Sequence, residues 1–224
     1  MRKPTVIFFD VNETLLDLGP LKTSVGAALG GREDLLPLWF TTMLHYSLVD
    51  TMTDNYRDFA QIGVAALMMI AEKQGIEIDR QTAEDAIIEP FLHLPPHPDV
   101  KSALEKLAKS DIEIVSLTNS TAEGVTTQFE YAGIIQYFDR RISTEEVQAF
   151  KPDPRPYAHA LKTVSVAPDD ALMVAAHAWD LAGAKKAGMQ TAFIRRPGAT
   201  LYPNAERPDH VVDSLAEIIE ALGL

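Results

Sequence analysis

A change of pattern after the first strand constrains the fold of this sequence more than any other feature. The apolar run Val6 to Phe9 is short and rich in β-formers, ends in Asp10, and predicts a buried strand. From Leu15 to about His93 the apolar residues instead recur at helical spacings, with hardly any β-branched run between them. The sequence therefore predicts one strand followed at once by a set of helices.

Strands and helices alternate after a stiff connector at Pro95–Pro98. Predicted strands cover 112–117, 171–175, 191–194 and 211–212, and predicted helices cover 122–132, 154–163, 181–187 and 214–222. Such alternation predicts an α/β fold with a parallel sheet covered on both faces. Residues 1–14 and 96–224 would form this core, and residues 15–95 a helical insertion. Because the insertion follows the first strand, we expect it to lie over that strand's carboxyl end as a lid.

Composition excludes several functions. The 224 residues fit one domain, or a core with one insertion. With no cysteine, the chain has no disulfide framework, thiol nucleophile or thiolate zinc site. A net charge of −12 argues against nucleic acid or an anionic membrane as partner. No secretory signal is visible, and the longest nearly apolar stretch, Ile62–Ala71, is about half of a bilayer span. We expect a soluble, cytoplasmic protein.

Polar side chains follow the predicted strands. They are Asp10, then Thr118, Asn119 and Ser120, then His177 and Asp180, with Lys151 in a loop before a helix. Because the carboxyl ends of parallel strands share one edge, we expect these residues to meet there. Taken singly, each has an ordinary structural interpretation as a turn residue, a helix cap or a solvated lysine. Their convergence on one edge favours a functional site.

Four motifs in this order resemble those of the haloacid dehalogenase superfamily. They are Asp10-Val11-Asn12-Glu13-Thr14-Leu15, Ser116-Leu117-Thr118-Asn119, Lys151-Pro152-Asp153 and Ala178-Trp179-Asp180. The likeness runs from about Val6 to Val212. Within the superfamily the chain is most similar to the L-2-haloacid dehalogenases (type II), through Trp39, Leu44, Tyr46, Phe59, Tyr157 and Trp179.

The resemblance implies a Rossmann-like core with a helical cap inserted after the first strand. It implies that Asp10 is a nucleophile that forms an aspartyl ester, which water hydrolyses. Further roles follow from it. Thr14 would orient Asp10, and Lys151 would be the cation for the substrate anion. Thr118 and Asn119 would receive the substrate carboxylate. An apolar wall would consist of Leu44, Phe59 and Trp179, and the substrate site would be completed by Asn12, Phe40 and Tyr157.

Two positions distinguish a dehalogenase from the phosphatases of the superfamily. Phosphatases carry a second Asp two residues after the nucleophile as a general acid, and here that residue is Asn12. They also hold Mg²⁺ partly with a Gly-Asp pair where this chain has Ala175-Ala176. A halide leaving group needs neither an acid nor a metal. Both departures predict substitution at carbon, with no metal and no cofactor.

The chain also departs from the dehalogenase pattern. Trp39 is followed by Phe40, where the family has an Arg that receives the halide. Asn12 stands where the family has a Tyr. Ala175 and His177 replace a Ser and an Asn. His177 either bonds to the backbone at a helix start or activates the water that attacks the ester, oriented by Asp180. Asp180 with Lys151 is the alternative base.

The leading hypothesis is a metal-independent 2-haloacid dehalogenase whose partners are a small 2-haloacid and water. The alternatives are a Mg²⁺-dependent phosphatase, the same carboxylate chemistry on a non-halide leaving group such as a strained ring amine, and a binding module without activity. The helix around Ile62–Ile70 is apolar on much of its surface, which fits burial under the core or in a homodimer.

Overall fold

A computed structural model describes residues 3–224. Within them a sheet forms from β1 (Val6–Phe9), β2 (Glu113–Thr118), β3 (Arg140–Ser143), β4 (Ala171–Ala175), β5 (Gln190–Ile194) and β6 (His210–Val212). The helices are α1 (Gly19–Ala28), α2 (Leu36–Met52), α3 (Phe59–Gln74), α4 (Arg80–Leu92), α5 (Val100–Leu107), α6 (Ala122–Ala132), α7 (Pro154–Val164), α8 (Ala178–Lys186) and α9 (Leu215–Ala221). Short 3₁₀ turns are η1 (Glu33–Leu35), η2 (Ile135–Tyr137), η3 (Thr144–Val147) and η4 (Pro168–Asp170).

The sheet has the order β3-β2-β1-β4-β5-β6, and its neighbouring strands are parallel. Successive residues of β1 point to opposite faces: Ile7 and Phe9 join one hydrophobic cluster, and Val6 and Phe8 join the other. Both faces are therefore buried, which explains why β1 is a continuous apolar run.

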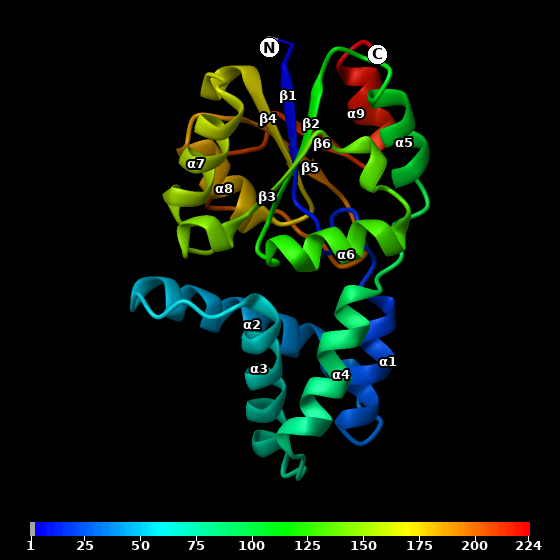
Figure 1. Ribbon diagram of the computed structural model, residues 1–224, viewed down its shortest axis with the longest axis vertical. Helices are drawn as coiled ribbons and strands as arrows, with labels where there is room; N and C mark the ends of the chain where they lie inside the picture. Colours follow the sequence, from blue (N-terminus) through cyan, green and yellow to red (C-terminus); the bar gives the residue numbers. More distant parts are fainter. Residues whose placement is uncertain (1–2) are drawn as a thin grey trace.

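Helices cover the two faces of the sheet (Figure 1). On one side α7 and α8 contribute Leu161 and Leu181 to the cluster around Phe8. On the other side α5, α6 and α9 contribute Leu104, Phe129 and other apolar side chains to the cluster around Phe9. The strand order changes direction around β1, so a crevice for a ligand is expected at its carboxyl end.

Helices α1 to α4 form a block beyond that end of the sheet (Figure 1). Asp58 caps the start of helix α3, where its side chain accepts from the Gln61 N–H, and Gly75, which has a positive φ of 68°, caps its end. Trp39 of α2 donates from Nε1 to the Gly63 carbonyl of α3 at 2.8 Å. A Cβ at Gly63 would lie 3.2 Å from the Trp39 ring, so glycine allows this close packing.

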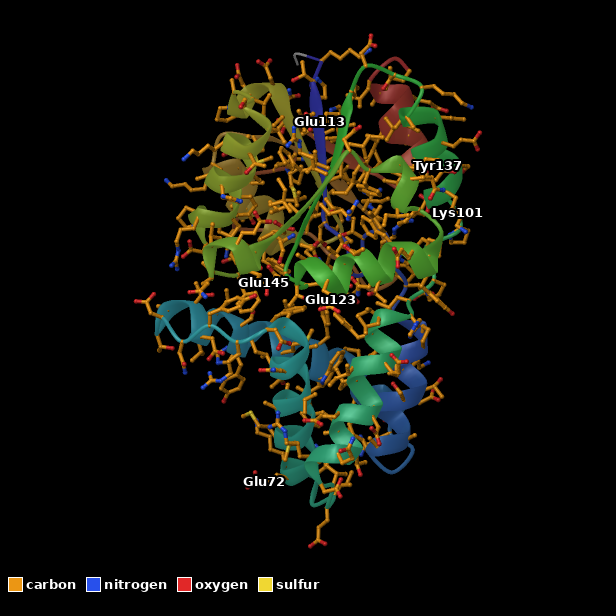
Figure 2. The ribbon with its side chains drawn as sticks, in the orientation of Figure 1. Glu72, Lys101, Glu113, Glu123, Tyr137 and Glu145 are labelled. Atoms are coloured by element: carbon orange, nitrogen blue, oxygen red, sulfur yellow. The ribbon has the colours of Figure 1, made fainter. Side chains whose placement is uncertain are left out.

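The core and the helical block meet across a shared apolar layer. The Phe150 N–H of the core donates to Thr51 Oγ1 of α2 at 3.0 Å, and the Phe59 ring of α3 packs against Phe150 with centroids 5.7 Å apart. Figure 2 shows Glu123 and Glu145 on the side of the core that faces the block, and Glu113 near the opposite end of the sheet. The carboxyl end of β1, which Asp10 follows, thus lies at the junction of the two parts.

The predicted α/β class, with a helical cap inserted after the first strand, is confirmed. The division at residues 14 and 95 stays a prediction. Two elements are missing from the sequence-based prediction, α5 and β3, and α8 begins at Ala178 rather than Leu181. Over residues 3–224, no helix combines the length and apolar character needed to cross a membrane.

Candidate active site

Asp10 follows β1 directly and is 5% exposed. Its carboxylate accepts three hydrogen bonds: Oδ1 from Lys151 Nζ at 2.9 Å, and Oδ2 from Thr14 Oγ1 at 2.7 Å and from His177 Nδ1 at 2.8 Å. Burial alone would raise the pKa of Asp10, but the charges of Lys151 and His177 lower it far below the usual 3.8. Asp10 is therefore an ionised carboxylate in a fixed orientation.

Thr14 fixes that orientation from the same loop. Its hydroxyl donates to Asp10 and accepts from the Ala176 N–H at 2.9 Å. The loop after β1 is thereby tied to the end of β4. The expected role of Thr14 in orienting Asp10 fits this geometry.

Lys151 is fully buried, with none of its side chain exposed. Its ammonium donates to Asp10 Oδ1, to Asp180 Oδ2 at 2.6 Å and to the Leu117 carbonyl at 2.7 Å. Burial would lower the pKa of Lys151, but the two carboxylates raise it, so it stays charged. An ammonium has three N–H donors, and all three are occupied by the protein. The role of Lys151 as the cation for the substrate anion stays a prediction, and in this structure its ammonium acts on Asp10 and Asp180.

Asp180 is buried on α8 and is held by Lys151 and by Tyr157, whose hydroxyl donates to Asp180 Oδ1 at 2.6 Å. Burial and the charge of Asp10 raise the pKa of Asp180, against the opposite effect of Lys151. Burial beside Asp180 also raises the pKa of Tyr157, which keeps its proton. Tyr157 thus lies beneath Asp180, away from the cavity described below.

His177 occupies the N-cap position of α8. Its Nδ1 donates to Asp10 and its Nε2 to Glu13 Oε2, both at 2.8 Å. Burial would lower the pKa of His177, but its hydrogen bonds to the two carboxylates, and their charges, raise it to about 10. Asp180 bonds to Lys151 and Tyr157 rather than to His177, and the raised pKa favours a charged ring, so the role of His177 as a base oriented by Asp180 has no support in this geometry and stays a prediction.

A cavity of about 670 Å³ opens beside His177. It lies between α2 and the segments that follow β4 and β5, and is lined by Glu13, Leu18, Leu36, Pro37, Phe40, Thr41, Leu44, Ala176, His177, Ala178, Trp179 and residues 196–203. The His177 ring stacks on Phe40 and on Trp179, with centroids 5.8 and 5.0 Å away. His177 therefore contacts both Asp10 and the cavity.

Of the expected substrate-binding residues, Phe40, Leu44 and Trp179 line this cavity. Phe59 instead packs between Phe91 and Phe150 in the apolar layer, so its place in a wall of this cavity is not supported.

Thr118, Asn119 and Asn12 also bond within the protein. Thr118 Oγ1 accepts from the Ser120 N–H, and Asn119 Oδ1 accepts from the Lys151 N–H. The Asn12 amide donates to Ser120 Oγ and accepts from Gln128 Nε2, both at 3.1 Å. These three residues shape the edge of the sheet around Asp10 and lie outside the cavity lining.

Two residues of the site were not predicted as site residues. Glu13 lies inside the first motif, three residues after Asp10, but nothing in the sequence predicts its contact with His177. Arg196 follows β5 and bridges the Thr14 carbonyl and Asp99, with donor–acceptor distances of 3.0 and 2.8 Å. Nothing in the sequence around Arg196 marks this role. In residues 3–224, no three His, Asp or Glu side chains are grouped so that they could hold a metal ion.

Comparisons with known proteins agree with this architecture. A family model described as haloacid dehalogenase-like hydrolase matches residues 4–188. The chain is 30% identical to (S)-2-haloacid dehalogenase 2 of Pseudomonas sp. (strain CBS-3), over 95% of this chain and 93% of that protein. It is also 30% identical to (S)-2-haloacid dehalogenase 4A of Burkholderia cepacia, over 94% and 91%. The fold matches an L-2-haloacid dehalogenase of Xanthobacter autotrophicus with chloropropionic acid covalently bound, at a TM-score of 0.91, 25% identity and 98% coverage of both chains.

Proposed function

Because the chain belongs to the haloacid dehalogenase-like hydrolases, we propose that it hydrolyses small (S)-2-haloalkanoic acids to 2-hydroxy acids through an ester on Asp10. The buried Asp10 carboxylate carries this proposal, since three donors hold it ionised and oriented. One of these donors, His177, lines a cavity of small-molecule size. The names of the relatives supply the substrate class.

In the first step an Asp10 oxygen attacks C2 of the substrate, the carbon–halogen bond breaks, and the halide leaves with the bonding electrons. The carboxylate loses its charge when it becomes an ester. Its low pKa means that Asp10 is ionised at neutral pH, so no base is needed for this step. Thr14 and Lys151 restrict the side chain to one attack geometry.

In the second step water attacks the ester carbonyl of Asp10 and releases the 2-hydroxy acid. Lys151, beside Asp10 Oδ1, stabilises negative charge on the tetrahedral intermediate. We assign the role of base to Asp180, because the charged His177 has no free lone pair at neutral pH. Asp180 takes one proton of the attacking water as its oxygen bonds to the ester carbonyl carbon of Asp10. The ester C–O bond then breaks, and Asp180 returns that proton to the departing alkoxide, which leaves as the 2-hydroxy acid. The second proton of the water leaves the Asp10 carboxyl for solvent, which restores the carboxylate.

A phosphatase fits this site less well. The Asn12 amide bonds to Ser120 and Gln128 and has no acidic proton for a leaving alkoxide. The same substitution on a non-halide leaving group is favoured by one observation: Phe40 stacks on protonated His177 where the family has a halide-binding Arg. An imidazolium is able to give a proton to an amine or fluoride leaving group.

Halide release from both enantiomers of 2-chloropropionate, chloroacetate and fluoroacetate, with and without EDTA, tests the proposal. We expect EDTA-resistant release that favours the (S)-enantiomer and is abolished in Asp10→Asn. Asp180→Asn should release one equivalent of halide and retain the ester, visible by intact mass. Phosphate release from small esters, with no halide release, would support the phosphatase instead.

We also propose that the protein forms a homodimer through α2. Ile62, Leu67 and Ile70 of α3 are buried within the chain, so they offer no surface for a partner. Leu38, Leu48 and Met52 form an exposed apolar stripe along α2. Light scattering should report a dimer for the wild type and a monomer for Met52→Glu; a monomeric wild type would contradict the proposal.

A further inference from the structure

Glu13 has a backbone conformation that is uncommon for a residue with a side chain. Its φ is 62°, in the left-handed region that favours glycine. Two hydrogen bonds hold it there: its N–H donates to the Leu16 carbonyl at 2.9 Å, and its carbonyl accepts from His97 Nε2 at 3.0 Å. Residues in such conformations cluster at functional sites, so the Glu13 side chain is a candidate for a specific task.

The Glu13 side chain reaches the nucleophile through one imidazole ring. His177 Nε2 donates to Glu13 Oε2 and His177 Nδ1 donates to Asp10 Oδ2, both at 2.8 Å. A histidine that donates from both ring nitrogens is positively charged, so this geometry holds an imidazolium between two carboxylates. Burial would lower the pKa of His177, but the hydrogen bonds to Asp10 and Glu13 raise it to about 10, in agreement with this charge.

The faces of the His177 ring contact uncharged groups. Phe40 of α2 and Trp179 of α8 stack on the ring, and the nearby carboxylate of α8, Asp180, bonds to Lys151 instead. Only 11% of the His177 side chain is exposed, so water contributes little to stabilising its charge. The charge therefore depends on the two carboxylates that accept from the ring nitrogens.

Two further titratable side chains line the cavity beside His177 in the described part of the chain, Arg196 and Tyr202. Arg196 is a cation that is bonded within the protein, and Tyr202 is neutral at pH 7, so neither favours a charged imidazole. Of the two carboxylates on the ring, Asp10 loses its charge when it becomes an ester. Glu13 is then the carboxylate that keeps His177 charged.

The charge on His177 affects the second step of the proposed reaction. There the water oxygen bonds to the ester carbonyl carbon of Asp10, and the electron pair of the C=O bond moves to the carbonyl oxygen. When this intermediate collapses, the pair re-forms the C=O bond and the bond to the product oxygen breaks. Negative charge thus grows on oxygens of the Asp10 carboxyl group, beside the His177 Nδ1–H, which keeps its proton throughout. A charged donor stabilises this charge roughly twice as strongly as a neutral one.

We propose that Glu13 is a positioning residue for hydrolysis of the Asp10 ester, and that it acts by holding His177 as a charged donor against the reacting carboxyl group. This inference rests on the proposed function for the reaction. It deepens that function by assigning a role in one step only. In the first step the Asp10 carboxylate loses charge, so a charged donor there gives no acceleration.

Two variants and a control separate this role from a structural one. Glu13→Gln keeps an acceptor for His177 Nε2 and removes the charge, and Glu13→Gly removes the side chain at a φ that glycine adopts freely. Glu146→Gln is the control, because Glu146 accepts from His159 Nε2 at 2.9 Å in another part of the core. The imidazole nitrogen signals of His177, assigned with His177→Gln, are followed by NMR from pH 6 to 10 in the resting protein. Halide release from (S)-2-chloropropionate, and the amount of ester by intact mass, are measured over the same range.

We expect both Glu13 variants to lower the pKa of His177 by about 1–3, the effect of removing a nearby opposite charge. As pH rises above the lowered pKa, kcat should fall by about tenfold, the factor for exchanging a charged donor for a neutral one. One equivalent of halide should still be released, so the ester accumulates. Below the lowered pKa His177 is charged again, and kcat should return to the wild-type value, which a structural defect would not allow. Glu146→Gln should match the wild type throughout.

Three results in which the wild type releases halide would overturn the inference alone. They are an unchanged His177 pKa in both Glu13 variants, a lowered pKa without accumulation of the ester, and a kcat that stays low at every pH. A wild type that releases no halide would refute the proposed function, and the inference with it.

Discussion

Replacing Lys151 with methionine should destabilise the protein strongly while nearly preserving side-chain volume. The change removes the ammonium that Asp10, Asp180 and the Leu117 carbonyl share, at distances of 2.9, 2.6 and 2.7 Å. Removing one partner from a buried ion pair costs about 3–5 kcal/mol, because the remaining charge is unpaired. For a chain of this size, each kcal/mol lowers Tm by about 2–4 °C, so the expected fall is roughly 6–20 °C.

The assay is urea unfolding near pH 7 and pH 5, with calorimetric Tm as a second measure. Without Lys151, burial raises the pKa of the remaining carboxylates above their unfolded values. Stability is then regained as pH falls, and the difference from wild type should narrow at the lower pH. The control is Lys109→Met. It removes an exposed contact between Lys109 and Glu105 at 3.2 Å and should change the free energy of unfolding by less than about 1 kcal/mol.

A second substitution separates charge from packing. Asp180→Asn removes one of the two unpaired carboxylates, so Lys151→Met with Asp180→Asn should be more stable than the sum of the single changes predicts. Two results would refute the account of Lys151 as the cation shared by Asp10 and Asp180. One is a Lys151→Met variant whose free energy of unfolding near pH 7 is within about 1 kcal/mol of wild type. The other is a double variant whose change in that free energy equals the sum of the two single changes.

Three further outcomes follow from the buried contacts. The pKa of His177 is about 10 in the folded protein and 6.5 in the unfolded chain, so its contribution to stability is full below pH 6.5 and is lost as pH rises toward 10. In urea unfolding measured across this pH range, His177→Gln should lack this decline in the free energy of unfolding. An identical decline in the variant would argue against the charged ring. Tyr157→Phe should cost about 1.5–3 kcal/mol in the free energy of unfolding, since Asp180 Oδ1 loses a donor at 2.6 Å; a loss below about 0.5 kcal/mol would contradict this. Gly183→Ala should lower the free energy of unfolding by about 1–3 kcal/mol, measured by calorimetry, because the new Cβ would lie 2.6 Å from Tyr157 Oη and 2.8 Å from Pro152 Cβ. An unchanged free energy of unfolding would contradict this, since it would show that Tyr157 and Pro152 move aside.

Much of the fold was predictable because local signals and tertiary structure agree. The apolar β1 and helix α6 are examples; α6 spans Ala122–Ala132 and is capped by Gly133, which has a positive φ of 63°. Strand β3 was missed because it is four residues long, begins with two arginines and depends on pairing with β2. Helix α5 carried a readable signal, since its buried residues Val100, Ala103, Leu104 and Leu107 have helical spacing.

The residues of the site were easier to predict than their contacts. Asp10 and Asp180 follow predicted strands and Lys151 precedes a predicted helix, so topology brings them together. Which donor bonds to which acceptor depends on side-chain geometry that no spacing records. For this reason the pairing of His177 with Glu13 and the saturation of Lys151 emerged only from the structure.

The saturation of Lys151 separates reactivity from recognition. Every donor of that ammonium is bonded to protein, so the electrostatic environment of Asp10 is built before any ligand arrives. The cavity wall at Phe40 and Trp179 contacts this environment through the His177 ring. Substrate preference is therefore free to diverge at the wall while the nucleophile stays unchanged, and a library of variants at position 40 should yield altered selectivity more often than loss of the ester-forming step.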